Sequence, residues 1–216
     1  MTELFRHKAV IICGHFGTGK TNVAVNLALC AGRRGMNVSI ADMDTVNPYF
    51  RTADNASFLE KNGVTVLLPQ FANTNVDIPT LPPSLPLIFD GVRYSITDVG
   101  GNEEGAVVIR GFRDRYEEIG YDMYYVFNHY RPENVDTEFS VASLRSIENA
   151  TLLKFTGIIN NSNLGVETTR KIVDDARKYA EDFAFAVGLP LVMTTAFRQN
   201  AGGNDTVIED VTKKLF

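Results

Sequence analysis

The chain has 216 residues and a mass of 23.9 kDa, the size of one ordinary domain. Hydrophobic residues make up 44% and charged residues 22%, a composition that excludes a mainly disordered or fibrous chain. Lys and Arg total 21 against 26 Asp and Glu, which gives a net charge of −5, so a nucleic-acid partner is not expected. The two cysteines, Cys13 and Cys30, have no CxxC spacing, which excludes a disulfide framework and a cysteine-ligated metal cluster.

The sequence contains no signal for a membrane or an export route. No apolar run approaches the roughly 18 residues that cross a bilayer, and residues 1–8 are polar and charged with no apolar signal core behind them. We therefore expect a cytoplasmic protein without a membrane partner.

Short apolar segments rich in β-branched residues alternate with longer amphipathic segments along the chain. This alternation predicts β-α units around a parallel sheet, and the nearly continuous apolar character of the short segments predicts strands covered on both faces. We expect one α/β domain over residues 1–216, with helices on both faces of a mostly parallel sheet in three α/β/α layers. The predicted strands are residues 9–13, 37–42, 64–68, 94–98, 122–127, 155–160 and 190–195.

Apolar residues at helical spacing predict helices around residues 23–31, 108–119 and 172–187. A further stripe of apolar residues lies within 207–216. It carries Glu209 and Asp210 beside only two lysines, which disfavours an anionic membrane surface. We interpret this last stripe as a final helix packed on the domain.

A proline-rich insertion interrupts the pattern at about residues 69–90. Five of the eight prolines lie between Pro69 and Pro86, so regular structure is not expected there. Long loops inside compact domains are often functional. Residues 71–87 are therefore a candidate lid or partner surface, with a rigid spacer as the alternative.

The strongest motif is a phosphate-binding loop between the first strand and the first helix. It matches G-x-x-x-x-G-K-[ST] and consists of Gly14, His15, Phe16, Gly17, Thr18, Gly19, Lys20 and Thr21. Its backbone N–H groups and the following helix N-terminus would bind phosphate oxygens. Lys20 would reach the β- and γ-phosphates, and the Thr21 hydroxyl would bind Mg²⁺. The alternative is a chance glycine-rich turn.

Two acidic segments follow predicted strands, where open α/β sheets bind ligands. Asp42 and Asp44 are two residues apart, so both carboxylates would face the same side. Asp98 ends a strand and is followed by Gly100 and Gly101, as needed to bind Mg²⁺ and bring a backbone N–H to the γ-phosphate. An ordinary Gly-Gly turn is the alternative for this second segment.

Taken together, these residues resemble the MinD/ParA/CobQ-type P-loop NTPases of the SIMIBI class, which include the nitrogenase iron protein and dethiobiotin synthetase. The resemblance covers most of the chain. The segments that carry it are 14–28, 35–44, Asp98 and 157–161. It implies a mostly parallel sheet flanked by helices and the binding of ATP with Mg²⁺.

The resemblance also implies roles for individual residues. Asp44 is similar to the aspartate that orients the attacking water, and Asp98 to the Mg²⁺-side aspartate of the second switch, so Thr21, Asp42 and Asp98 are the predicted metal ligands. Asn161 is similar to the asparagine that reads adenine, with Asn160 as the alternative. Since no carboxylate stands in 160–163 to read guanine, we expect ATP rather than GTP.

One position departs from the resemblance. Members that work as ATP-sandwich dimers often carry a second lysine after the first glycine of the loop, and this chain has His15 there. His15 would be mostly neutral at pH 7, so either a packing role or a phosphate contact is open. Arg51 is a candidate substitute cation, with an ordinary surface arginine as the alternative. A homodimer is thus a possibility that the sequence leaves open.

These observations favour a Mg²⁺-dependent ATPase that hydrolyses ATP to ADP and phosphate. Its switch segments, 44–51 and 98–105, would pass the change to an unknown protein partner. The alternative is an enzyme in which ATP activates a small-molecule carboxylate substrate, with residues 71–87 and the aromatic run 121–130 as candidate walls of a substrate site. A third hypothesis is a nucleotide-sensing module with negligible turnover.

Overall fold

A computed structural model describes residues 4–44, 55–67, 85–134 and 136–211. Their strands form one sheet in the order β3-β2-β4-β1-β5-β6-β7-β8, in which every neighbouring pair is parallel. The strands are β1 (Ala9–Cys13), β2 (Val38–Met43), β3 (Val64–Leu67), β4 (Tyr94–Val99), β5 (Tyr121–Phe127), β6 (Gly157–Asn160), β7 (Leu191–Phe197) and β8 (Thr206–Ile208). The expected parallel sheet is confirmed.

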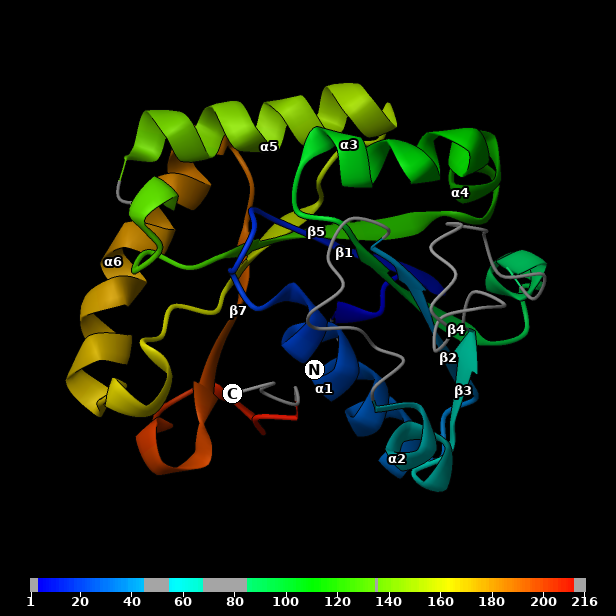
Figure 1. Ribbon diagram of the computed structural model, residues 1–216, viewed down its shortest axis with the longest axis horizontal. Coiled ribbons are helices and arrows are strands. Elements are labelled where there is room, and N and C mark those ends of the chain that lie inside the picture. Colours follow the sequence, from blue (N-terminus) through cyan, green and yellow to red (C-terminus); the bar gives the residue numbers. More distant parts are fainter. Residues whose placement is uncertain (1–3, 45–54, 68–84, 135, 212–216) are drawn as a thin grey trace, which may run out of the picture.

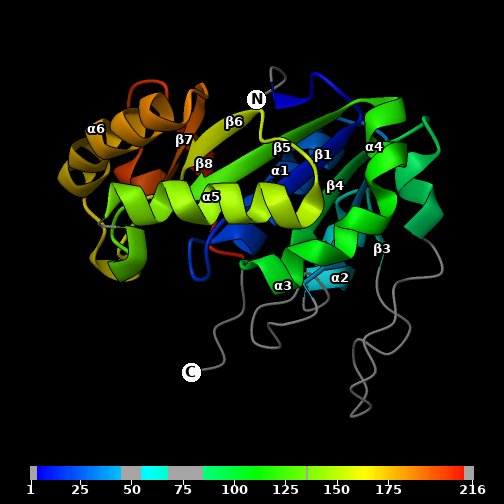
Figure 2. The ribbon, with the colours of Figure 1, turned by 90° about the horizontal axis from the view of Figure 1, so that it is seen from above.

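Helices cover both faces of this sheet, as Figures 1 and 2 show. One face carries α1 (Lys20–Arg33) and α2 (Ala56–Lys61). The other carries α3 (Glu103–Ala106), α4 (Arg113–Ile119), α5 (Thr137–Thr151) and α6 (Arg170–Val187). Short 3₁₀ helices connect the elements: η3 (Leu85–Phe89), η4 (Val107–Phe112), η5 (Pro132–Asn134), η6 (Gly165–Glu167) and η7 (Arg198–Asn200).

The two faces of the sheet bury separate hydrophobic cores. Successive side chains of a strand point to opposite faces, so Ile11 and Tyr125 join the core beneath α5 and α6, while Ile12 and Tyr124 join the core against α1. All four side chains are fully buried. The three-layer α/β/α architecture follows directly from this alternation.

All seven predicted strands are present, and no end differs from its predicted position by more than two residues. The helices predicted at 23–31 and 172–187 lie within α1 and α6, whereas the stripe at 108–119 forms two elements, η4 and α4. Cys13 is buried, Cys30 is half-buried and both are free. Among the described helices, none has the length and apolar character required to cross a membrane.

The prediction of a final helix at the C-terminal stripe is wrong for its described part. Thr206–Ile208 is β8, which pairs with β7 and is the edge strand of the described sheet. The residues that follow are held against α1, because the Glu209 N–H donates to Asn26 Oδ1 at 2.8 Å and the Val211 N–H to Asn22 Oδ1 at 3.1 Å. Residues 212–216 lie outside the described residues.

Most of the proline-rich segment also lies outside the described residues, as do residues 45–54 with Arg51. The described end of the insertion is η3, whose Leu85 and Ile88 are buried in the core under α4. Residues 85–89 are therefore part of the packed domain.

Candidate functional site

The loop of residues 14–19 turns from the carboxyl end of β1 into the N-terminus of α1, and its glycines are required by the backbone. Gly14 has a φ of +147°, and a Cβ there would overlap the Val126 carbonyl of β5. Gly19 has a φ of +86°, and a Cβ there would overlap the Asn161 amide. Gly19 is also the N-cap of α1 and offers no side chain to the first N–H groups of the helix. Those N–H groups are thus available to an anion such as phosphate.

The functional groups of the loop are arranged around its backbone. Lys20 is buried, and its Nζ lies 3.5 Å from the His15 carbonyl oxygen. The Thr18 hydroxyl donates to the same carbonyl at 2.8 Å and closes the turn. Phe16 is 52% exposed at the rim, with its ring centroid 6.0 Å from Lys20 Nζ. The loop therefore has the shape and charge of a phosphate cradle.

Three carboxylates gather beside Lys20. Asp42 on β2 and Asp98 on β4 are register partners in adjacent strands, and the Asp44 N–H donates to Asp42 Oδ1 at 3.0 Å. All three residues are buried. Burial, reinforced by the charge of Asp42 and opposed by that of Lys20, raises the pKa of the Asp98 carboxyl well above its ordinary value.

The same residues fit Mg²⁺. Neither oxygen of the buried Asp98 carboxylate has a hydrogen-bond partner among the described residues, and a divalent cation would satisfy both. Asp42 is adjacent in the register, and the Thr21 hydroxyl lies beside Asp98. No group of three or more His, Cys, Asp or Glu suited to hold a metal occurs in the described part of the chain. Mg²⁺ is commonly held by one or two carboxylates together with phosphates and water, and Asp42 and Asp98 are two such carboxylates.

The segment after β4 lies directly on the loop. A Cβ at Gly101 would stand 2.8 Å from Lys20 Nζ and 2.8 Å from the Phe16 nitrogen. Gly100 packs equally closely on Gly105, and its Cβ position is 3.3 Å from Asp44 Oδ1. The structure thus brings the predicted second switch into contact with both Lys20 and Asp44.

Asn161 braces the loop from below. Its Nδ2 donates to the Thr18 carbonyl at 2.8 Å, and its Oδ1 accepts from the Thr195 hydroxyl of β7 at 2.6 Å. Asn160 Oδ1 accepts the Ser162 N–H at 3.1 Å, and its buried Nδ2 has no partner among the described residues. Base recognition by either asparagine stays a prediction, whereas the brace to Thr195 was not foreseen because β7 is remote in sequence.

The His15 side chain contacts α5. Its ring packs edge-on against Phe139 of α5, with centroids 5.5 Å apart, and its Nδ1 is buried without a partner in the described residues. This geometry fits the packing role, and a phosphate contact by His15 stays a prediction.

Arg131 was missed by the sequence analysis. It follows β5, and its side chain reaches the loop: a Cβ at Gly17 would lie 3.4 Å from Arg131 Nε and 3.5 Å from its Cζ. No motif marks this residue. The only signal is that it follows the carboxyl end of a strand.

A cavity of about 300 Å³ lies between η6 and the carboxyl ends of β7 and β8, a volume that accommodates a nucleobase. One wall is attached to α1 through the hydrogen bonds of Glu209 and Val211 to Asn26 and Asn22. The cavity is lined by Gly165, Val166, Phe197, Arg198, Gln199, Ile208, Glu209 and Asp210. It is the candidate site for the base.

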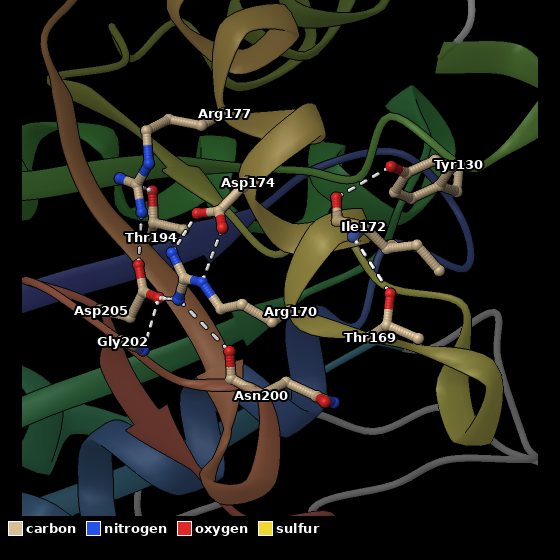
Figure 3. Close-up of polar contacts among 10 residues, drawn as sticks. All are labelled: Tyr130, Thr169, Arg170, Ile172, Asp174, Arg177, Thr194, Asn200, Gly202 and Asp205. Atoms are coloured by element: carbon tan, nitrogen blue, oxygen red, sulfur yellow. Dashed lines mark hydrogen bonds and ion pairs between the residues drawn. The ribbon is translucent and has the colours of Figure 1, made fainter.

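An ion-pair network fixes the loop between β7 and β8 that contributes to this cavity. Figure 3 shows Arg170 and Arg177 of α6 converging on Asp205, whose side chain is buried. Arg170 Nη1 also donates to the Asn200 carbonyl at 3.3 Å, and Arg177 Nη1 to the Thr194 hydroxyl at 3.2 Å. Burial alone would raise the pKa of Asp205. The hydrogen bonds from Arg170, the Gly202 N–H and Arg177 outweigh it and hold that pKa below its ordinary value.

The aromatic run 121–130 does not line a substrate site where β5 forms it. Tyr124 and Tyr125 are fully buried in the two cores, and the Tyr130 hydroxyl donates to the Ile172 carbonyl of α6. Central strands of a doubly covered sheet are buried on both faces, which explains why this expectation was wrong.

The fold is shared with solved structures of FtsY. No family model and no curated protein matches the chain. Cell division protein FtsY from Thermotoga maritima is 17% identical, with a TM-score of 0.55 over 89% of this chain and 63% of that one. Chloroplast FtsY from Physcomitrella patens is also 17% identical, with a TM-score of 0.55 over 94% of this chain and 62% of that one. The signal recognition particle receptor FtsY from Elizabethkingia anophelis, in complex with GDP, is 13% identical, with a TM-score of 0.52 over 89% of this chain and 58% of that one.

The chain therefore spans somewhat less than two thirds of the length of these structures. The likeness confirms the fold, a parallel sheet in three α/β/α layers. At identities of 13–17%, the likeness does not test the narrower resemblance to MinD/ParA/CobQ-type proteins.

Proposed function

We propose that this chain binds a purine nucleoside triphosphate with Mg²⁺, hydrolyses it to the diphosphate and phosphate, and acts as a nucleotide-dependent switch on a partner. The observation that carries the proposal is the buried group of Lys20, Asp42 and Asp98 at the open N-terminus of α1. A buried carboxylate with two unpartnered oxygens is costly unless a ligand compensates it, and Mg²⁺ with triphosphate would do so.

In this mechanism the loop backbone and the α1 N-terminus bind the phosphate oxygens, and Lys20 neutralises their charge. Thr21, Asp42 and Asp98 would hold Mg²⁺, which supplies charge stabilisation for phosphoryl transfer. Asp44 lies next to Gly100 at the same edge. We assign to it the orientation of the attacking water.

The switch would run through the segment after β4. Gly101 lies against Lys20, so its backbone is placed to respond to the γ-phosphate. Asn102 caps α3 by accepting the Gly105 N–H at 2.9 Å, and the Ser146 hydroxyl of α5 donates to Glu103 at 2.7 Å. A shift of Gly101 would thus move α3 and α5. We propose that the partner binds these helices and responds to that movement.

ATP is the first candidate nucleotide, because residues 160–163 contain no carboxylate to accept the N1–H and amino protons of guanine. GTP is the second candidate, favoured by Glu209 and Asp210 on the cavity wall and by the GDP bound in a structure of the same fold. Competition of ATP and GTP for a fluorescent triphosphate analogue decides between them.

Substitutions at two positions test the core of the proposal. Lys20→Ala removes the charge in the cradle and is expected to abolish triphosphate binding, while Lys178→Ala, an exposed lysine of α6, should bind as the wild type does. Asp44→Ala should retain binding and suppress phosphate release. Normal turnover in Asp44→Ala would remove Asp44 from the mechanism, and equal binding by Lys20→Ala would refute the nucleotide site.

The partner is open between a protein and a small-molecule carboxylate. We propose a protein partner, because the segment after β4 connects the cradle to α3 and α5. The alternative is an enzyme that uses the triphosphate to activate a small-molecule carboxylate. It would be favoured if a mixture of carboxylate metabolites, free of macromolecules, accelerated diphosphate formation.

A further inference from the structure

A triphosphate held in the cradle would be stabilised by a second cation beside Lys20. A triphosphate carries several negative charges, and Lys20 is the single lysine of the cradle. His15 stands where related proteins carry a further lysine, but its ring packs on Phe139. We propose that Arg131 is a phosphate-binding residue that acts on the nucleotide held by its own loop. This inference rests on the proposed function.

The position of Arg131 is fixed by its backbone. The Arg131 N–H donates to the Asn128 carbonyl at 3.2 Å, and the Asn134 N–H donates to the Arg131 carbonyl at 2.8 Å. The buried Asn134 side chain closes the same turn by donating to Asn128 O at 2.9 Å. The turn is attached to the segment after β6 that holds Asn161, since the Asn163 N–H donates to Asn128 Oδ1 at 3.3 Å.

The Arg131 side chain is exposed and lies over Gly17. Within the described residues its guanidinium has neither a hydrogen bond nor an ion pair, unlike Arg145, Arg170 and Arg177, which are bound to carboxylates or carbonyls. A guanidinium binds phosphate through parallel N–H bonds. The Arg131 guanidinium lies at the rim of the phosphate cradle and is therefore available to bind a phosphate oxygen.

The closeness to Gly17 explains a further feature of the motif. A side chain at this position would meet Arg131 at ordinary contact distance, and Gly17 has a φ of +75°. A glycine here leaves the guanidinium free access to the cradle.

The test compares Arg131→Ala, Arg131→Lys and Arg34→Ala. Arg34 is an exposed arginine at the far end of α1 and serves as the matched control. Affinity for a fluorescent triphosphate analogue and turnover are measured for each. We expect Arg131→Ala to lose roughly tenfold or more in triphosphate affinity or in turnover, Arg131→Lys to recover part of the loss, and Arg34→Ala to match the wild type. Thermal unfolding without nucleotide should be unchanged, since the guanidinium has no partner to lose.

A mixing experiment tests whether Arg131 acts within its own chain. Lys20→Ala chains carry an intact Arg131 but no working cradle, and they are added to Arg131→Ala chains. The expected result is no recovery of turnover. Recovery would overturn action within one chain, and wild-type affinity and turnover in Arg131→Ala would overturn the role altogether. Failure of the wild type itself to bind triphosphate would refute the proposed function, and this inference with it.

Discussion

Gly101 is the residue where the proposed switch meets the cradle. Its Cβ position lies 2.8 Å from both Lys20 Nζ and the Phe16 nitrogen, closer than a real Cβ approaches such atoms. Gly101→Ala should therefore displace Lys20 or the segment itself. We expect at least a roughly tenfold loss of triphosphate affinity, measured by titration with a fluorescent analogue.

Gly111 provides the control for this substitution. It lies in η4, with no atom within 4 Å of its Cβ position and no positive φ. Gly111→Ala should bind triphosphate as the wild type does. If Gly101→Ala also bound normally, the contact with Lys20 would have no functional role, and the route from the γ-phosphate to α3 would be refuted.

For single residues, the sequence predicts those parts of the site that are adjacent along the chain. Gly14 to Thr21 form a local motif whose function follows from its spacing and context. Asp42 and Asp98 required one more step, the rule that ligands bind at the carboxyl ends of parallel strands. Arg131 and Thr195 were not predictable, because they reach the loop through strand order and carry no motif of their own.

Among the elements, α6 and the loop after β7 are joined by Asp205, which makes their stability dependent on pH. Burial would raise the Asp205 pKa, but the hydrogen bonds from Arg170, Gly202 and Arg177 hold it below its ordinary value. A carboxylate with a lowered folded pKa stabilises the fold fully above its unfolded pKa of about 3.9 and loses this contribution as the pH falls through the folded pKa. Asp205→Asn should therefore be less stable than the wild type at neutral pH, and the difference should shrink below about pH 4.

Asp174→Asn is the control for this prediction. Asp174 also pairs with Arg170, but it lies on the surface of α6 with 49% of its side chain exposed, where an ion pair contributes little. Chemical unfolding of the three proteins between pH 3 and pH 7 measures the effect. A stability difference for Asp205→Asn that is constant across this range would contradict the assigned pKa shift.

Helix α5 and strand β8 are two of the elements that were not predicted from the sequence. The first carries polar residues on its buried face, and the second is only three residues long. The inner face of α5 combines Leu144 and Ile147 with Ser140, Glu148 and Thr151, so no apolar stripe marks it. Glu148 is buried because it is bound by Arg145, Lys154 and the Phe155 N–H, contacts that only the folded chain creates. The three residues of β8 were included in a helical stripe because alternation cannot be recognised over so short a strand.

For the whole molecule, the order of the strands determines where the chemistry occurs. β1 lies between β4 and β5, and β4 lies between β2 and β1, so the carboxyl ends that carry the cradle, Asp42 and Asp98 are neighbours. β5 contributes the Arg131 turn on the other side of β1. The described residues of the proposed site therefore come from the carboxyl ends of neighbouring strands in a single sheet.

This arrangement predicts turnover by the monomer. A sandwich dimer supplies a cation from the partner chain, whereas here Arg131 already lies on the Gly17 segment of its own loop and His15 packs against Phe139. We expect turnover per chain to be constant on dilution. We also expect the solution mass to stay at that of one 23.9 kDa chain with either Mg²⁺-bound triphosphate or diphosphate, using Asp44→Ala so that the triphosphate survives. A mass that doubles only with triphosphate, together with turnover that rises with protein concentration, would show that the phosphate site is completed by a second copy and that Arg131 is not sufficient.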